Sequence, residues 1–121
     1  MSDTTTNRAI VERLFAAMCA GDLTVVDELV ADDFVQHNPQ VQSGREAFRG
    51  FLAAVTPVES TVYRVIADDD LVAIHHHFVT FNSAVVDIFR VVDGTVVEHW
   101  DVIQPVPETT AGGLDLFSQR T

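Results

Sequence analysis

The spacing of apolar residues changes at Pro57, and this change restricts the possible folds more than any other feature of the chain. Before Pro57, apolar residues recur at the spacing of amphipathic helices over residues 7–20, 23–33 and 45–55. After it come runs rich in β-branched residues and separated by turn signals: Thr61 to Ala67, Leu71 to Phe81, Ala84 to Val92 and Thr95 to Gln104. Three helices followed by an antiparallel meander predict an α+β fold, in which the helices cover one face of a strongly curved sheet and leave a cleft for a small molecule.

The composition narrows the function classes. A chain of 121 residues predicts one domain, residues 1–121, and a net charge of −11 argues against nucleic acid or an anionic membrane as a partner. All seven basic residues are Arg, and a chain without Lys has neither lysine Schiff-base chemistry nor a P-loop. The single cysteine, Cys19, excludes an internal disulfide. The sequence shows no membrane-spanning run and no signal peptide, so we expect a cytoplasmic protein.

Two carboxylates lie inside the hairpin VVDIFRVVDGTVVEHWD, although Asp is a poor strand former and an unpaired buried charge is costly. Because side chains alternate along a strand, the turn at Asp93-Gly94 decides whether Asp87 and Asp101 share a face. A two-residue turn separates them. A three-residue turn with Gly94 as a left-handed bulge residue places Asp87 opposite His99, with Asp101 nearby. We favour the three-residue turn, which gathers Asp87, His99 and Asp101 on one face.

The favoured register leaves an apolar row on the opposite face of the sheet. It contains Val86, Ile88, Val96 and Trp100, and such a row is too apolar to leave in water. We therefore expect a homodimer formed through Val86, Ile88 and Trp100. An alternative for the acids stays open: on a solvated edge strand, Asp87 and Asp101 are ordinary surface charges.

The histidines allow more than one interpretation. His75 and His77 share a face of their strand, and together with His37 they could form a three-histidine metal site. Otherwise they are hydrogen-bonding residues, and His99 can support Asp87 as a core histidine instead of acting directly. The turn at Asn82-Ser83 decides which histidines face the cleft, and the sequence leaves its length open. We place His75 and His77 at the substrate site and expect no metal.

Large apolar residues are expected to close the cleft and to bind the substrate. In the helical half these are Phe15, Met18, Phe34, Phe48 and Phe51, while Val85 and Phe89 share a strand face with Asp87. A carboxylate in an apolar pocket has a raised pKa and is a stronger base. A second carboxyl nearby cannot readily ionise as well, so one of the pair is expected to stay protonated and to donate a hydrogen bond.

Two stretches, ADDFVQHNPQVQSGREAF and VVDIFRVVDGTVVEHWDVIQPVPE, resemble the SnoaL-like polyketide cyclase group. This group belongs to the nuclear transport factor 2-like superfamily, together with ketosteroid isomerase and scytalone dehydratase. The resemblance covers nearly the whole chain and implies a cone-shaped, mostly antiparallel sheet around three N-terminal helices, an apolar pocket and a dimer through the sheet. It places the base of the cyclases at Asp101 and the protonated Asp of the isomerase at Asp87. The segment that matches the isomerase's own base, His37-Asn38-Pro39, carries no acid.

The expected function is that of a cofactor-free cyclase or isomerase acting on a small hydrophobic carbonyl compound. Asp101 removes a proton α to the carbonyl, and Asp87 with His99 or His37 stabilises the enolate oxygen. An intramolecular aldol closure or a double-bond isomerisation follows. One alternative is a non-catalytic binding module for a small hydrophobic ligand. A second is a metal-dependent enzyme that uses His37, His75 and His77.

Overall fold

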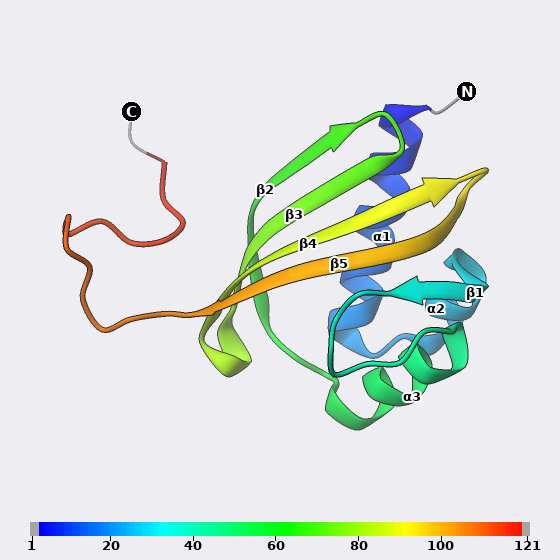
Figure 1. The fold of residues 1–121 in the computed structure, drawn as a ribbon, viewed down its shortest axis with the longest axis horizontal. Coiled ribbons are helices and arrows are strands. Elements are labelled where there is room, and N and C mark those ends of the chain that lie inside the picture. Colours follow the sequence, from blue (N-terminus) through cyan, green and yellow to red (C-terminus); the bar gives the residue numbers. More distant parts are fainter. Residues whose placement is uncertain (1–2, 120–121) are drawn as a thin grey trace.

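The computed structural model describes residues 3–119, which form three α-helices, five strands and one 3₁₀ turn (Figure 1). The elements are α1 (Thr4–Ala20), α2 (Leu23–Leu29), β1 (Val30–Gln36), α3 (Arg45–Val55), β2 (Ser60–Asp68), β3 (Leu71–Phe78), the 3₁₀ turn η1 (Val79–Phe81), β4 (Ser83–Val92) and β5 (Thr95–Pro105). The two ends of the predicted 1–121 domain, residues 1–2 and 120–121, lie outside the described residues.

The strands form one open sheet in the order β1-β5-β4-β3-β2, and the α+β prediction is confirmed. β1 runs parallel to β5, while the other neighbours are antiparallel. Figure 1 shows α1 behind the sheet, with α2 and α3 beside β1. The second helix was expected to reach residue 33 but ends at Leu29, because Val30 already pairs with Val96 of β5.

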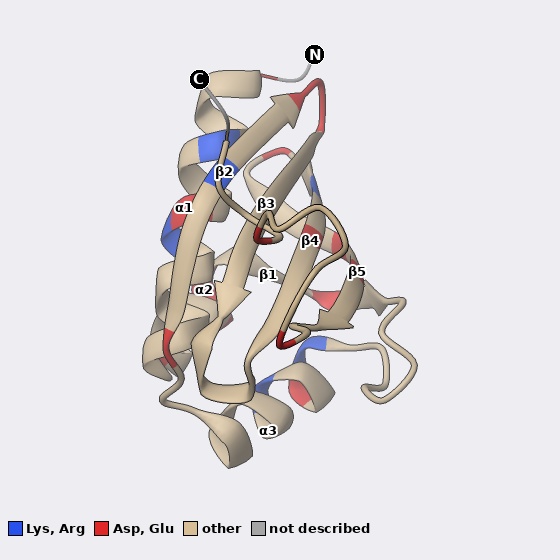
Figure 2. Ribbon diagram, turned by 90° about the vertical axis from the view of Figure 1, so that its left-hand side faces the viewer, with Lys and Arg blue, Asp and Glu red and all other residues tan. Residues whose placement is uncertain are grey.

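The core lies between the helices and one face of the sheet. Leu14 and Val26 from the helices belong to the same buried cluster as Val72 and Val96 from the strands, and all four side chains are fully buried. Each such side chain contributes roughly 1.5–3 kcal/mol of burial free energy. The acidic segments are spread over turns and edges of the fold (Figure 2), where water solvates their charge.

Gly21 ends α1 in the left-handed conformation, with φ of 78°, and its N–H donates to the carbonyl of Ala17. A Cβ at this position would lie 2.5 Å from Oγ1 of Thr56. We expect Gly21→Ala to lower the free energy of unfolding by roughly 1–3 kcal/mol in urea denaturation, because it combines backbone strain with this contact. Gly50→Ala is the matched control: Gly50 lies in α3 with open space around its Cα, so that change is expected to be neutral or stabilising.

The β4–β5 hairpin places Asp87 and Asp101 on the predicted shared face, but its turn differs from the expected one. The turn has two residues, Asp93 and Gly94, and Val92 pairs with Thr95. A register shift between Arg90 and Val91 then inserts one extra residue into β5, which restores the alternation. The predicted three-residue turn is therefore wrong.

The register that results places Asp87 opposite Asp101 and Phe89 opposite His99. The predicted pairing of Asp87 with His99 is wrong by two residues along β5, and Val96, which was expected on the opposite face, lies in the core. The two acids and His99 nevertheless share one face of the sheet, because the bulge and the predicted longer turn change the alternation in the same way.

Residues after β5 leave the sheet (Figure 1), and Phe117 packs back against the outer face of β2 and β3. The ring of Phe117 lies 5.0 Å from Tyr63 and 4.9 Å from His77, and the Phe117 carbonyl accepts a 2.6 Å hydrogen bond from Arg64. None of the helices within residues 3–119 has the length and apolar character needed to cross a membrane.

Candidate functional site

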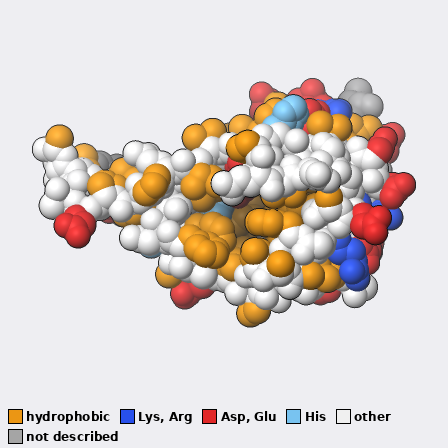
Figure 3. Space-filling model, turned by 60° about the horizontal axis from the view of Figure 1, so that its bottom comes forward, with side chains coloured by type: hydrophobic (Ala, Val, Ile, Leu, Met, Phe, Trp, Pro, Cys, Tyr) orange, Lys and Arg blue, Asp and Glu red, His pale blue; other side chains and the backbone are white. Residues whose placement is uncertain are grey.

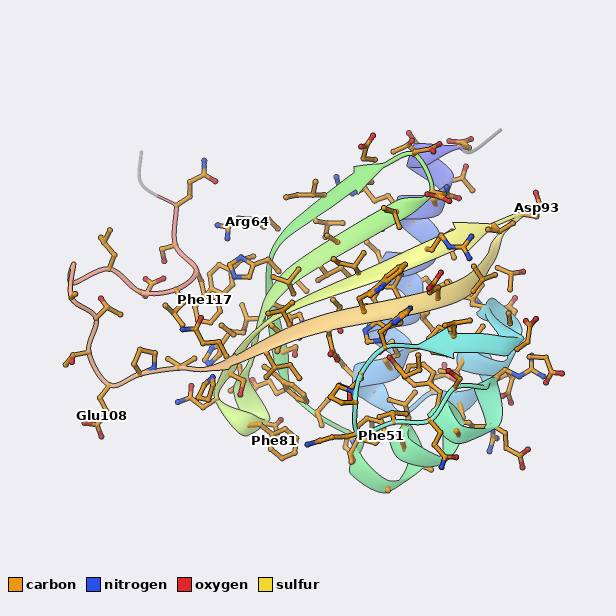
Figure 4. The ribbon with its side chains drawn as sticks, viewed as in Figure 1. Phe51, Arg64, Phe81, Asp93, Glu108 and Phe117 are labelled. Atoms are coloured by element: carbon orange, nitrogen blue, oxygen red, sulfur yellow. The ribbon has the colours of Figure 1, made fainter. Side chains whose placement is uncertain are left out.

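A cavity of about 360 Å³ lies between the concave face of the sheet and helices α1 and α3. Most of its lining is apolar and includes Phe15, Met18, Phe48, Phe51, Phe78 and Val85. Figure 3 shows its opening as a hollow surrounded by hydrophobic side chains, and Figure 4 places Phe51 and Phe81 on the two sides of this region. An apolar pocket of this size suits a small organic molecule.

Asp87 is buried in the wall of this cavity, and both its oxygens are hydrogen-bonded. Oδ1 accepts from Nε2 of His99 at 2.7 Å, and Oδ2 accepts from Nε2 of His76 at 2.6 Å. All three residues are buried. Burial raises the pKa of Asp87, but the hydrogen bonds from His76 and His99 outweigh it and hold this pKa below its ordinary value. Asp87 is therefore a carboxylate with both oxygens occupied, not the protonated donor that the resemblance implied.

The two histidines extend this buried cluster in opposite directions. His99 Nδ1 lies 2.7 Å from Oε1 of Gln36, which also accepts from the backbone N–H of Asn38 at 3.0 Å. At the other side, His76 Nδ1 lies 3.1 Å from Oγ of Ser60. The rings are also packed: Phe15 meets His76 edge-on at 4.7 Å. Their orientation is therefore fixed by both hydrogen bonds and contacts.

Asp101 lines the same cavity but is less buried than Asp87. Its Oδ2 accepts a 2.8 Å hydrogen bond from Nδ2 of Asn38, and its Oδ1 has no hydrogen-bond partner among residues 3–119. Oxygen or nitrogen atoms of Asp101, Asp87 and His99 lie within 4.8 Å of one another. Both oxygens of Asp87 accept hydrogen bonds from histidines, so Asp101 is the acid of this group with an oxygen left for a ligand.

His37 does not reach the cavity. Its ring stacks on Trp100 at 4.9 Å, and its Nε2 lies 2.6 Å from Oε2 of Glu98. The hydrogen bond to His37, together with Arg90, holds the pKa of Glu98 below its usual range. The direct role expected of His37 is therefore wrong on geometric grounds, and its two sequence neighbours, Gln36 and Asn38, line the cavity instead.

His75 and His77 also lie outside the cavity, on the outer face of the sheet. The connection from β3 to β4 pairs Phe78 with Ser83, and this register sets His76 opposite Val85 on the inner face. The rings of His75 and His77 instead pack on Phe117. The predicted contacts of His75 and His77 with a substrate are therefore not formed, and the three-histidine metal site does not assemble among the described residues.

The predicted apolar ligand contacts divide into two groups. Phe15, Phe51 and Val85 line the cavity, as do Met18 and Phe48. Phe34 and Phe89 are fully buried behind it, with their rings 6.4 Å and 4.7 Å from the His99 ring. They position His99 and do not contact the cavity.

Four polar residues of the site were not singled out from the sequence: Gln36, Asn38, Ser60 and His76. Strand alternation starting from Asp87 could have placed His76 on the inner face, but only if the length of the β3–β4 connection had been known. The extended segment before Pro39 offered a signal for Gln36 and Asn38, because neighbours of an outward-facing His37 must point inward.

The SnoaL-like domain family model matches residues 11–99. The chain belongs to this family. Comparison with curated proteins finds no match. The SnoaL-like match includes Asp87 and His99 and ends just before Asp101.

Solved structures of other proteins share the SnoaL-like chain's fold. A nuclear transport factor 2-like protein of unknown function from Burkholderia xenovorans is 18% identical, with a TM-score of 0.77 over 97% of each chain. A proposed ketosteroid isomerase from Kribbella flavida is 24% identical, with a TM-score of 0.76 over 100% of this chain and 94% of that one. IdmH, a proposed polyketide cyclase from Streptomyces antibioticus, is 25% identical, with a TM-score of 0.64 over 80% and 91%. The first two show the fold alone.

Proposed function

We propose that this SnoaL-like protein catalyses proton transfer at a carbon α to a carbonyl group, without a cofactor. Asp101 removes the proton, and an aldol closure or a double-bond isomerisation follows from the enolate. The observation that carries the proposal is the Asp101 carboxylate in an apolar cavity, held by Asn38 through one oxygen and free at the other. A positioned carboxylate of this kind accelerates proton transfer by roughly 10²- to 10⁴-fold.

The enolate oxygen requires a hydrogen-bond donor near Asp101. Asp87 does not serve, because its oxygens accept from His76 and His99. Gln36 lines the cavity, and its amide oxygen is fixed by His99 and by the Asn38 N–H. Its NH₂ group, which makes no hydrogen bond within residues 3–119, is the donor we assign to the enolate. A proposed polyketide cyclase and a proposed ketosteroid isomerase share the fold of this chain, which supports a reaction of this general class.

The experiment uses 2-tetralone, a bicyclic ketone with acidic α-protons, dissolved in deuterated water. We expect the protein to exchange these protons faster than buffer does, with a rate that saturates as the ketone concentration rises. Cys19 is the only cysteine and lines the cavity, so protection of its thiol from iodoacetamide reports occupancy independently. Burial raises the pKa of this thiol, so the labelling is run at mildly alkaline pH.

The same experiment separates catalysis from binding alone. Protection of Cys19 without accelerated exchange, across a panel of such ketones, favours the non-catalytic binding module. If the ketones neither protect Cys19 nor exchange their α-protons faster than in buffer, the result contradicts both the catalytic function and the binding function.

We also propose that the protein forms a homodimer through the outer face of its sheet. Val86, Ile88 and Trp100 lie half-buried on this face, and Val102 beside them is 67% exposed. Sedimentation at micromolar concentration is expected to give a dimer for the natural chain and a monomer for Val102→Glu, because a charge on this row opposes association. A monomeric natural chain contradicts this proposal and leaves the pocket chemistry unaffected.

A further inference from the structure

A hydrogen-bonded chain of five side chains crosses the wall of the pocket from Gln36, through His99, Asp87 and His76, to Ser60. The proposed proton transfer uses the Gln36 end, next to Asp101. The opposite end, Ser60, lines the same cavity at the start of β2 and has no part in that step. The protons along the chain decide what Ser60 offers to a ligand.

The charge of the cluster follows from its donors and acceptors. The Asn38 N–H donates to Oε1 of Gln36, so an oxygen and not the NH₂ group faces His99. His99 therefore has an acceptor at each ring nitrogen, Oε1 of Gln36 and Oδ1 of Asp87. A ring that donates from both nitrogens is a cation, and this cation balances the Asp87 carboxylate.

His76 is then the neutral histidine of the cluster. Its Nε2 faces Oδ2 of Asp87 and carries the hydrogen, which leaves a lone pair on Nδ1. The hydroxyl of Ser60, 3.1 Å away, donates to this lone pair. The Cys19 thiol also lies within hydrogen-bond reach of the Ser60 side chain. Because Ser60 has one hydrogen and commits it to His76, its oxygen acts only as an acceptor toward this thiol and toward the cavity.

We propose that Ser60 binds a hydroxyl group of the substrate, which donates to Oγ of Ser60. The position of the substrate's carbonyl at Asp101 rests on the proposed function, whereas the hydroxyl site itself does not. β2 and β5 are three strand spacings apart in the sheet, on the order of 14 Å along its surface and less across the concave face. The ligand therefore carries its two oxygens at opposite ends.

The lining between these ends defines the rest of the substrate. Phe15, Phe78 and Val85 lie along the wall, so the body of the ligand is apolar. Among the described residues, none that lines the cavity is Lys or Arg, so a carboxylate or phosphate group on the ligand would lack a counter-ion. The substrate class is an uncharged hydroxy-ketone with an apolar body.

The test compares 2-tetralone with 6-hydroxy-2-tetralone, which adds a hydroxyl at the far end of the same ketone. We expect calorimetry to show about tenfold tighter binding of the hydroxy compound by the natural protein, as one hydrogen bond of this kind provides. Ser60→Ala is expected to abolish this preference and to leave the affinity for 2-tetralone within about twofold, which also shows that the variant is folded.

Ser83→Ala is the matched control, because Ser83 also lines the cavity but donates its hydroxyl to the carbonyl of Phe81. It is expected to keep the tenfold preference. Equal affinities in the natural protein, or a preference that survives in Ser60→Ala, overturn the hydroxyl site. A Ser60-dependent preference without any α-proton exchange supports the hydroxyl site and removes the catalytic proposal, so the two failures are distinguishable.

Discussion

Asp101→Asn is expected to lower the rate of α-proton exchange by about 10²- to 10⁴-fold while ligand binding changes little. The amide has the size of the carboxyl group but cannot accept the proton. Binding stays because most of the cavity wall is apolar and does not involve residue 101. Exchange is measured by NMR in deuterated water, and binding by protection of the Cys19 thiol.

Asp33→Asn is the matched control for this variant, since Asp33 is an exposed residue of β1. It is expected to exchange α-protons at the natural rate. Full exchange activity in Asp101→Asn removes Asp101 from the mechanism. A parallel loss of both exchange and Cys19 protection points instead to a damaged pocket.

Asp87→Asn is expected to lower the free energy of unfolding by roughly 3–5 kcal/mol at pH 7, because it removes a buried charge from two hydrogen-bonded histidines. The amide NH₂ group faces a histidine N–H on one side, and the charge of the remaining cluster is no longer balanced. Urea denaturation of the natural protein and the variant measures the difference, and the exposed Asp33→Asn is expected to stay within about 0.5 kcal/mol.

The pH dependence of this difference tests the charge of Asp87. Its folded pKa lies below the ordinary value of 3.8, so the carboxylate contributes stability that is fully present above pH 3.8. That contribution is lost as pH falls from 3.8 through the folded pKa. The gap between the natural protein and Asp87→Asn should therefore narrow below pH 3.8, and an equal gap at pH 7 and pH 3 would show that Asp87 is not ionised in the folded state.

The sequence was sufficient for the fold because its local signals agree with the final packing. The helical spacing before Pro57 and the β-branched runs after it correspond to α1–α3 and β2–β5. The difference at Val30 arose from a long-range contact, the parallel pairing of β1 with β5, which a local pattern does not contain.

The face shared by Asp87, His99 and Asp101 was predictable from alternation, but their pairing was not. The bulge in β5 has no Gly or Pro to mark it, and it shifts every pair beyond it by one residue. A wrong turn length thus gave the right face, because two different one-residue changes have the same effect on alternation.

The histidines show the limit of strand alternation most clearly. The HHH run gives two choices of inward face, and the choice depends on a β3–β4 connection that forms a 3₁₀ turn, with Asn82 left-handed at φ 46°. One further residue in that connection would have brought His75 and His77 inward and moved His76 out. Ser60 pairs with Phe78 at the start of β2, so its place at the pocket depends on the same connection.

The most direct test of the catalytic site is a crystal structure of Asp101→Asn with 2-tetralone bound, because this variant holds the ketone without turning it over. We predict that an α-carbon of the ketone lies within about 3.5 Å of the side chain at position 101, with its carbonyl oxygen near the Gln36 amide. A ketone bound with its α-carbons directed away from position 101, or bound outside the cavity, would contradict the assignment of Asp101 as the base.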